Sequence, residues 1–206
     1  MKISSGRIFV LLIAAFSLFI GGCMGGPQVS RVDTNEQIDL SDKWNDTDSR
    51  LVADEMTGDM TRFPWIRMFQ QNHPGEVPTI IIKKIANKSH QHIAIDTFIN
   101  DIKRAGIRLG IVEFVVGGAE RNDIRDERKQ QDIYASEDSR AEMGQEEGAD
   151  FALSGSINSI VDQVGNKRVT FYQVDLKLVD MTKNKEVWNG QKKIKKLMKK
   201  SKFSLF

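Results

Sequence analysis

Residues 151–178 read FALSGSINSIVDQVGNKRVTFYQVDLKL, and this stretch decides the fold class. A run rich in apolar and β-branched residues starts at Phe151, and Gly165-Asn166 follows as a turn signal. Beyond the turn, apolar and polar residues alternate as far as Leu178, which is the period of a strand with one buried face. The pattern predicts a long antiparallel hairpin.

The sequence after this hairpin predicts one further turn over residues 180–185 and a last strand over residues 186–190. Lysine then occupies seven of the eleven positions from Lys192 to Lys202, and we expect these residues to lie beyond the last strand. Two interpretations stay open: a basic amphipathic helix that contacts an anionic lipid surface or acidic polymer, or a solubilising end. The lysines assigned to an anionic contact are Lys192, Lys193, Lys195, Lys196, Lys199 and Lys200.

The sequence before the hairpin alternates helix-like and strand-like segments. A capping cluster at residues 46–49 predicts a first helix, and the β-branched run at 79–82 predicts a buried strand that contains Ile81. Trp188, the large aromatic residue of the last strand, is likewise predicted to be buried. The remaining expected elements are a short helix at 63–71, an amphipathic helix at 95–106, a strand at 109–116 and two solvated helices within 121–148.

A strand, a helix and a second strand ahead of antiparallel strands imply a crossover connection that feeds an antiparallel sheet. The predicted fold class is therefore α/β, with a mixed parallel and antiparallel sheet and flanking helices.

The first 22 residues carry the features of a targeting segment. Lys2 and Arg7 precede an apolar run over residues 8–20, which is too short to span a bilayer as a helix. The string Ile20-Gly21-Gly22-Cys23 resembles a bacterial lipobox, so we predict a lipoprotein signal peptide over 1–22 and lipidation of Cys23. An ordinary signal peptide with a chance cysteine, or an uncleaved anchor, is the alternative. A polar tether of residues 23–41 follows.

Composition excludes several classes of function. One cysteine rules out an internal disulfide framework, and three histidines leave little material for a metal centre. His90 and His92 fit an exposed loop better than a metal site, and the sequence shows neither a phosphate-binding glycine motif nor a nucleophile with a base. Because the basic charge is concentrated in the C-terminal lysines, nucleic acid is not an expected partner. We expect no enzyme activity, no cofactor and no metal.

Three segments of the sequence resemble one family of envelope proteins: TIIIKKIANKS from Thr79, EEGADFALSGSINS from Glu146 and QVDLKLVDMTKNKEVWNGQKKIKK from Gln173. They resemble the LpoB family, and the most specific pieces are Gly148-Ala149-Asp150 and the end at Glu186–Gly190. The resemblance implies a domain over 42–196 similar to the N-terminal domain of TolB, followed by a basic tail over 197–206.

The same resemblance implies a non-catalytic lipoprotein on the periplasmic side of the outer membrane. Such a protein binds and activates a class A penicillin-binding protein, a peptidoglycan synthase. The tether here is shorter than the long proline-rich linker of the enterobacterial relatives. The alternative is a structural or assembly lipoprotein of the envelope, related to those of curli secretion.

Overall fold

The computed structural model describes residues 27–200 and divides the chain into two compact units, Met1–Glu36 and Gln37–Phe206. The described part of the first unit is exposed, and it holds a turn in which the Glu36 N–H donates to the Asp33 carbonyl over 3.1 Å. The predicted signal peptide and Cys23 lie outside the described residues.

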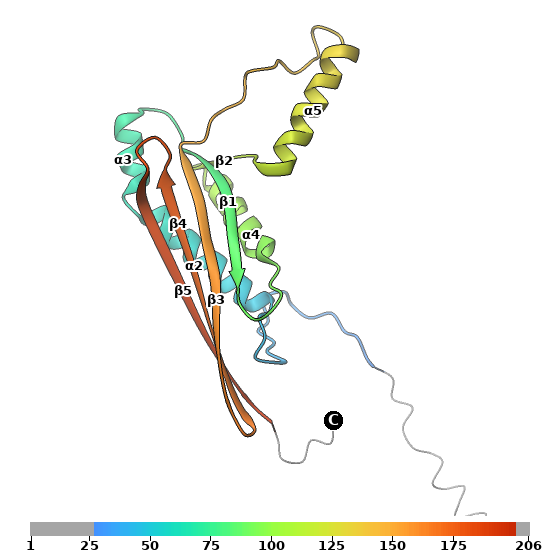
Figure 1. Ribbon diagram of the computed structural model, residues 1–206, viewed down its shortest axis with the longest axis vertical. Helices are drawn as coiled ribbons and strands as arrows, with labels where there is room; N and C mark the ends of the chain where they lie inside the picture. Colours follow the sequence, from blue (N-terminus) through green and yellow to red (C-terminus); the bar gives the residue numbers. More distant parts are fainter. Residues whose placement is uncertain (1–26, 201–206) are drawn as a thin grey trace, which may run out of the picture. The chain divides into compact units, whose positions relative to one another are not determined.

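The second unit is built on one five-stranded sheet, with the strand order β2-β1-β3-β4-β5 (Figure 1). β1 pairs with β2 and β3 in parallel, whereas β4 pairs with β3 and β5 in antiparallel fashion. The mixed sheet predicted from the sequence is therefore confirmed. The strands are β1 (Thr79–Lys88), β2 (Glu113–Val115), β3 (Phe151–Val164), β4 (Lys167–Asp180) and β5 (Lys185–Lys199).

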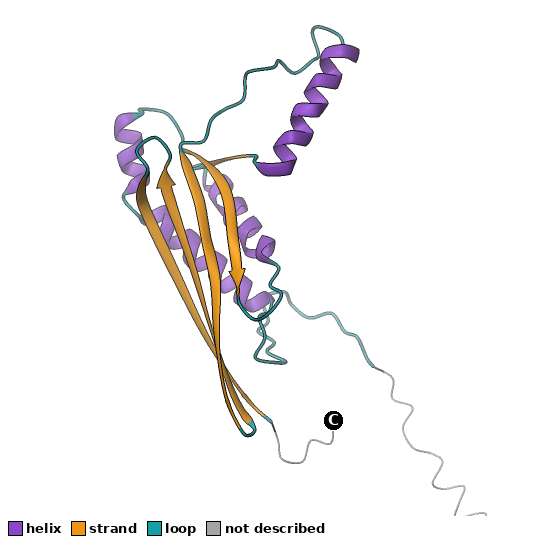
Figure 2. Ribbon diagram, in the orientation of Figure 1, coloured by secondary structure: helices purple, strands orange, loops and turns teal. Residues whose placement is uncertain are grey.

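Three helices, α2 (Asp46–Arg62), α3 (Trp65–Asn72) and α4 (Ile95–Leu109), contribute to the hydrophobic core against the sheet. In the view of Figure 2, α2 and α4 lie behind the sheet, and no helix within residues 27–200 covers the front of the β3-β4-β5 portion. Met56, Phe98 and Tyr172 are fully buried in the core, and Trp188 is only 2% exposed. Ile81 is also buried, so both burial predictions are confirmed.

The start of α2 follows from a capping box. Asn45 accepts a hydrogen bond from the Asp48 backbone N–H over 3.0 Å, and the Asp48 carboxylate accepts one in return from the Asn45 N–H. This arrangement satisfies backbone donors that the first turn of a helix leaves unpaired. The capping residue Asn45 thus lies one position before the cluster predicted over residues 46–49, and Asp48 of that cluster completes the capping box.

The folded unit extends further toward the N-terminus than the predicted domain start at residue 42, because the compact unit begins at Gln37. Asp39 forms an ion pair with Lys196 at 2.8 Å, and the Tyr172 hydroxyl donates to the Asp42 carbonyl over 3.0 Å. Thr170 also donates to the Asp42 carboxylate. Residues 37–41 thus belong to the folded unit, although their polar composition is typical of a tether.

The region between β2 and β3 differs from the prediction of two helices. One helix, α5 (Gly118–Tyr134), forms there, and residues 135–150 contain only turns and irregular structure. None of the α5 residues is buried. A second solvated helix would have no core to pack against, since none of residues 135–150 is buried, and helix propensity alone rarely stabilises so short a segment.

The C-terminal lysines also differ from the prediction. β5 runs from Lys185 to Lys199, so Lys192–Lys199 belong to the last strand rather than to a tail beyond it. The strand pairs with β4 along its length, as far as Lys167 opposite Lys199. The composition of this segment favours a solvated chain end. Backbone hydrogen bonds to β4 and ion pairs with acidic residues of α2 stabilise it as a strand instead.

Candidate functional site

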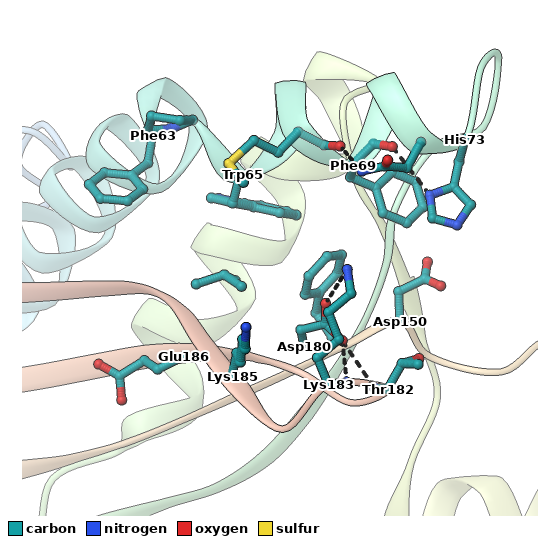
Figure 3. Close-up of a pocket in the computed structure, with 15 residues that line it drawn as sticks. Phe63, Trp65, Phe69, His73, Asp150, Asp180, Thr182, Lys183, Lys185 and Glu186 are labelled. Atoms are coloured by element: carbon teal, nitrogen blue, oxygen red, sulfur yellow. Dashed lines mark hydrogen bonds and ion pairs between the residues drawn. The ribbon is translucent and has the colours of Figure 1, made fainter.

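A pocket of about 630 Å³ opens between α3 and the turn that joins β4 to β5 (Figure 3). Its walls come from three parts of the chain: the start and the exposed side of α3, the first residues of β3, and residues 180–187. Figure 3 shows the aromatic side chains of α3 on one side and the polar side chains of the turn on the other. The site therefore combines an apolar wall with a charged rim.

The apolar wall is a cluster of aromatic rings. Trp65 and Phe69 contact Phe151 edge to face, with ring centroids 4.9 and 5.7 Å apart. The Trp65 indole N–H donates to the Met60 carbonyl over 2.9 Å, which fixes the ring against the end of α2. His73, at the end of α3, stacks on Phe69 with centroids 4.3 Å apart. These contacts hold the wall rigid, because each ring is fixed by a neighbour or a hydrogen bond.

The charged rim is organised around Asp180. Its carboxylate accepts hydrogen bonds from the backbone N–H groups of Thr182 and Lys183, over 3.0 and 2.8 Å. Burial raises the pKa of Asp180, but these hydrogen bonds and the Lys183 ammonium at 3.5 Å outweigh burial and lower the pKa. Asp180 is therefore a stable anion that shapes the turn, and it is not suited to accept and release protons near neutral pH.

Two large apolar side chains of the pocket face solvent. Met68 is 59% exposed and Phe63 is 44% exposed, whereas Trp65 beside them is buried. Exposed apolar side chains next to a pocket with a polar rim are typical of a surface that binds another protein or a peptide. Within residues 27–200, no group of three or more histidine, cysteine, aspartate or glutamate residues is placed to hold a metal ion.

The sequence did not indicate this pocket. Its aromatic residues between Phe63 and Phe69 fall within the short helix predicted at 63–71, which by itself indicates no binding site. The signal that was available is the apolar run Phe63-Pro64-Trp65-Ile66, which is too rich in large side chains for a purely solvated helix. What the run could not show is that residues 180–187, more than a hundred positions away, complete the pocket.

The structure separates the residues singled out from the sequence. His90 lies 2.6 Å from the Ser159 hydroxyl through its Nδ1, and its ring stacks near Tyr172 with centroids 6.4 Å apart. Lys192 and Lys196 make ion pairs with Glu55 and with Asp39 and Asp48. Lys193, Lys195, Lys199 and Lys200 are exposed instead.

No helix within residues 27–200 is long and apolar enough to cross a membrane. This finding concerns the described part of the chain alone.

The chain is similar to several solved structures. The lipoprotein GNA1162 from Neisseria meningitidis is 18% identical, and the match covers 62% of this chain and 89% of that one, with a TM-score of 0.38. The C-terminal domain of LpoB from Escherichia coli is 14% identical over 67% of this chain and 96% of that one, with a TM-score of 0.35. The corresponding Salmonella enterica domain is 14% identical over 64% and 93%, with a TM-score of 0.34.

A comparison with curated protein sequences gives no match. A family model, in contrast, matches residues 48–194, which include all but the first two residues of α2, every element from α3 to β4 and most of β5. That model describes the peptidoglycan-synthase activator LpoB, a regulatory rather than a catalytic family of outer-membrane lipoproteins. Because the match covers well over half of the sequence, the chain belongs to the LpoB family of peptidoglycan-synthase activators.

Proposed function

We propose that this chain is a non-catalytic lipoprotein, anchored through Cys23 on the periplasmic side of the outer membrane, that binds and activates a class A penicillin-binding protein. The observation that carries the proposal is the family match over residues 48–194, which covers most of the folded unit. Activation then requires only that the domain bind the active conformer of the synthase more tightly than the inactive one.

The pocket between α3 and the β4–β5 turn is the surface we assign to the synthase. Met68 and Phe63 offer exposed apolar area, and the Asp180–Lys183 turn offers fixed charges beside it. Protein interfaces commonly combine an apolar centre with a polar rim in this way. The rigid aromatic wall behind Met68 reduces the ordering cost of binding.

The short tether sets a condition on this partner. Residues 24–36 separate the predicted lipidated cysteine from the folded unit, and a fully extended chain of that length spans at most about 45 Å. The synthase must therefore present its contact region within that reach of the anchoring membrane, in addition to the length of the domain itself.

The test uses the chain without residues 1–22, with Cys23→Ser, mixed with a class A penicillin-binding protein from the same organism. We expect the two proteins to bind, and the rate of glycan polymerisation or cross-linking to rise. Met68→Glu should weaken both effects at least about tenfold, because it places a charge in the apolar centre of the interface. Ile107→Glu is the matched control, since Ile107 is 55% exposed on α4 and lies outside the pocket.

Two results would contradict the proposal. The first is that the chain neither binds nor stimulates any class A synthase of the organism. The other is capture, from envelope extracts, of copies of itself or of secretion components without a synthase, which would favour the structural or assembly alternative. If Met68→Glu and Ile107→Glu weaken synthase binding equally, the pocket is not the contact surface, although the synthase would still be the partner.

A further inference from the structure

The alternation of β5 divides its lysines between two faces of the sheet. Lys192 and Lys196 lie on the face that α2 covers, where Lys192 contacts Glu55 at 3.0 Å and Lys196 contacts Asp48 at 2.7 Å. Lys193, Lys195 and Lys199 point to the opposite face, because successive side chains of a strand alternate. All three are exposed, and none makes an ion pair with any residue from 27 to 200.

The strand register places apolar residues beside these free lysines. Lys195 is opposite Phe171 on β4, and Phe171 is opposite Ile160 on β3, so the three side chains form one row across the sheet. Leu197 lies between Lys195 and Lys199 on the same face. Ile160 is 66% exposed and Leu197 is 57% exposed. We call this surface the open basic face: Ile160, Phe171, Lys193, Lys195, Leu197 and Lys199.

Among residues 27–200, the helices α2 and α4 lie on one side of the sheet in Figure 1, and the open basic face is the opposite side from the one on which Lys192 and Lys196 contact α2. A solvated sheet face ordinarily carries mixed polar residues, which lowers its tendency to bind other surfaces. This face instead carries Lys193, Lys195 and Lys199 around exposed apolar side chains, and the same cross-strand rows add the cation Lys167 and a single carboxylate, Asp162. That combination complements a surface that is both negatively charged and able to accept apolar side chains.

The place where the tether enters the domain favours a lipid surface over an acidic protein. Asp39, near the start of the folded unit, pairs with Lys196, and the neighbours of Lys196 along β5 are Lys195 and Leu197 of the open basic face. The segment that leads to the predicted anchor thus joins the domain at β5, on the face of the strand opposite to the open basic face. A tether of at most about 45 Å then keeps the face close to the anchoring bilayer.

We infer that the open basic face binds the anionic phospholipid headgroups of the membrane in which the protein is anchored, and so orients the domain on the bilayer. The closeness of this face to the bilayer rests on the proposed anchor at Cys23, whereas its charge and its apolar side chains come from β3, β4 and β5. In this arrangement the lysines contact phosphate groups while Leu197 and Ile160 enter the headgroup region.

The experiment uses the chain without residues 1–22, with Cys23→Ser, so that no lipid anchor contributes to binding. Its co-sedimentation is measured with vesicles of phosphatidylglycerol and phosphatidylcholine, and with vesicles of phosphatidylcholine alone. We expect binding to the anionic vesicles only, and weaker binding as salt is added, because added salt shortens the screening length.

The triple variant Lys193→Gln, Lys195→Gln, Lys199→Gln should lower the vesicle partition coefficient at low salt by about a hundredfold, given the contribution expected of each lysine near an anionic surface. The matched control is Arg104→Gln, Arg108→Gln, Lys129→Gln, which removes three exposed cations on α4 and α5, outside both the open basic face and the pocket. The control should bind vesicles as the unmodified chain does. Both triple variants should still stimulate the synthase, which separates this inference from the proposed function.

Three outcomes would overturn the inference. The first is that the unmodified chain does not bind anionic vesicles at low salt. The second is that the two triple variants lose vesicle binding equally. The third is that the chain binds a soluble acidic polymer such as polyglutamate but not the vesicles. The third result would assign the open basic face to an acidic macromolecule instead of a bilayer. Circular dichroism of each variant establishes that a loss of binding does not come from unfolding.

Discussion

The Asp150 carboxylate lies 2.9 Å from both the backbone nitrogen and the hydroxyl oxygen of Thr79. Thr79 is the first residue of β1, and Asp150 directly precedes β3, so this contact aligns the starts of two parallel strands. The Asp150 carbonyl also accepts a hydrogen bond from the Met181 N–H, over 2.9 Å, at the end of β4. One residue therefore joins three strands next to the pocket.

Asp150→Ala should lower the free energy of unfolding by about 2–3 kcal/mol, because hydrogen bonds to a charged acceptor are strong and the backbone N–H of the buried Thr79 would lose the carboxylate that accepts from it. Urea denaturation followed by circular dichroism measures the change. Asp123→Ala is the control, since it removes a carboxylate from the solvated helix α5. Similar stabilities for the two variants would show that the Asp150 contact does not hold the strands.

Gly190 lies against the indole ring of Trp188, and a Cβ atom there would meet the ring and approach the Met56 sulfur to 2.9 Å. Trp188 itself is fixed by a hydrogen bond from its indole N–H to Asp59 on α2, over 2.7 Å. Gly190→Ala should therefore destabilise the domain by about 1–3 kcal/mol through overpacking. Thermal unfolding measures the effect. Gly148→Ala, where a Cβ meets nothing within 4 Å, should change stability much less.

Much of the fold could be predicted from local patterns in the sequence. The β-branched run of β1, the amphipathic face of α4 and the alternation after Gly165-Asn166 each report a local period, and the structure contains each of these elements. The end of β5 was missed for a physical reason. The sequence does not distinguish lysines that form ion pairs with acidic residues of α2 from lysines that face water. The extension of β5 through these lysines therefore depends on tertiary contacts that no local pattern reports.

The pocket could not be predicted in the same way. Its aromatic wall and its charged rim come from α3 and from the β4–β5 turn, which are distant in sequence, and no local spacing relates them. Gly148-Ala149-Asp150 was identified through the family resemblance, but the role of Asp150 depends on its contact with Thr79, 71 positions earlier. The prediction for Cys23 rests on sequence alone and stays a prediction.

Cys23→Ser should leave the full-length chain as an unprocessed precursor and abolish labelling by a fatty-acid probe, because the thiol is the atom that takes the lipid. Metabolic labelling followed by electrophoresis measures both effects. In a diderm host we expect the unmodified protein to fractionate with the outer membrane. Labelling that persists in the serine variant, or fractionation of the unmodified protein with the inner membrane, would contradict the predicted anchor.

Lys196→Met should lower the free energy of unfolding by about 3 kcal/mol, because it leaves the buried Asp48 carboxylate without its cationic partner. Lys195→Met, on the opposite face of the same strand, removes an equal charge that has no partner in the described chain and is the matched control. Chemical denaturation of the two variants provides the comparison. If both lose the same stability, the ion pair at Lys196 does not stabilise the junction between tether and domain.

The junction should also respond to acid in a defined direction. The hydrogen bond from Lys196 lowers the pKa of Asp39 from 3.8 to about 2, with further hydrogen bonds from Gln37 and Asn45 in the same direction. Because the pKa is lower in the folded state, Asp39 stabilises the fold above its unfolded pKa, and this stabilisation is lost as the pH falls from about 4 toward 2.

Asp39→Asn should accordingly be less stable than the unmodified chain at pH 7, and the difference should vanish as the pH approaches 2. The effect should be small, since the Asp39 side chain is 37% exposed and water screens the ion pair. Urea denaturation of both proteins at a series of pH values gives the difference directly. A stability difference for Asp39→Asn that persists unchanged at pH 2 would refute the assignment of this pH response to Asp39.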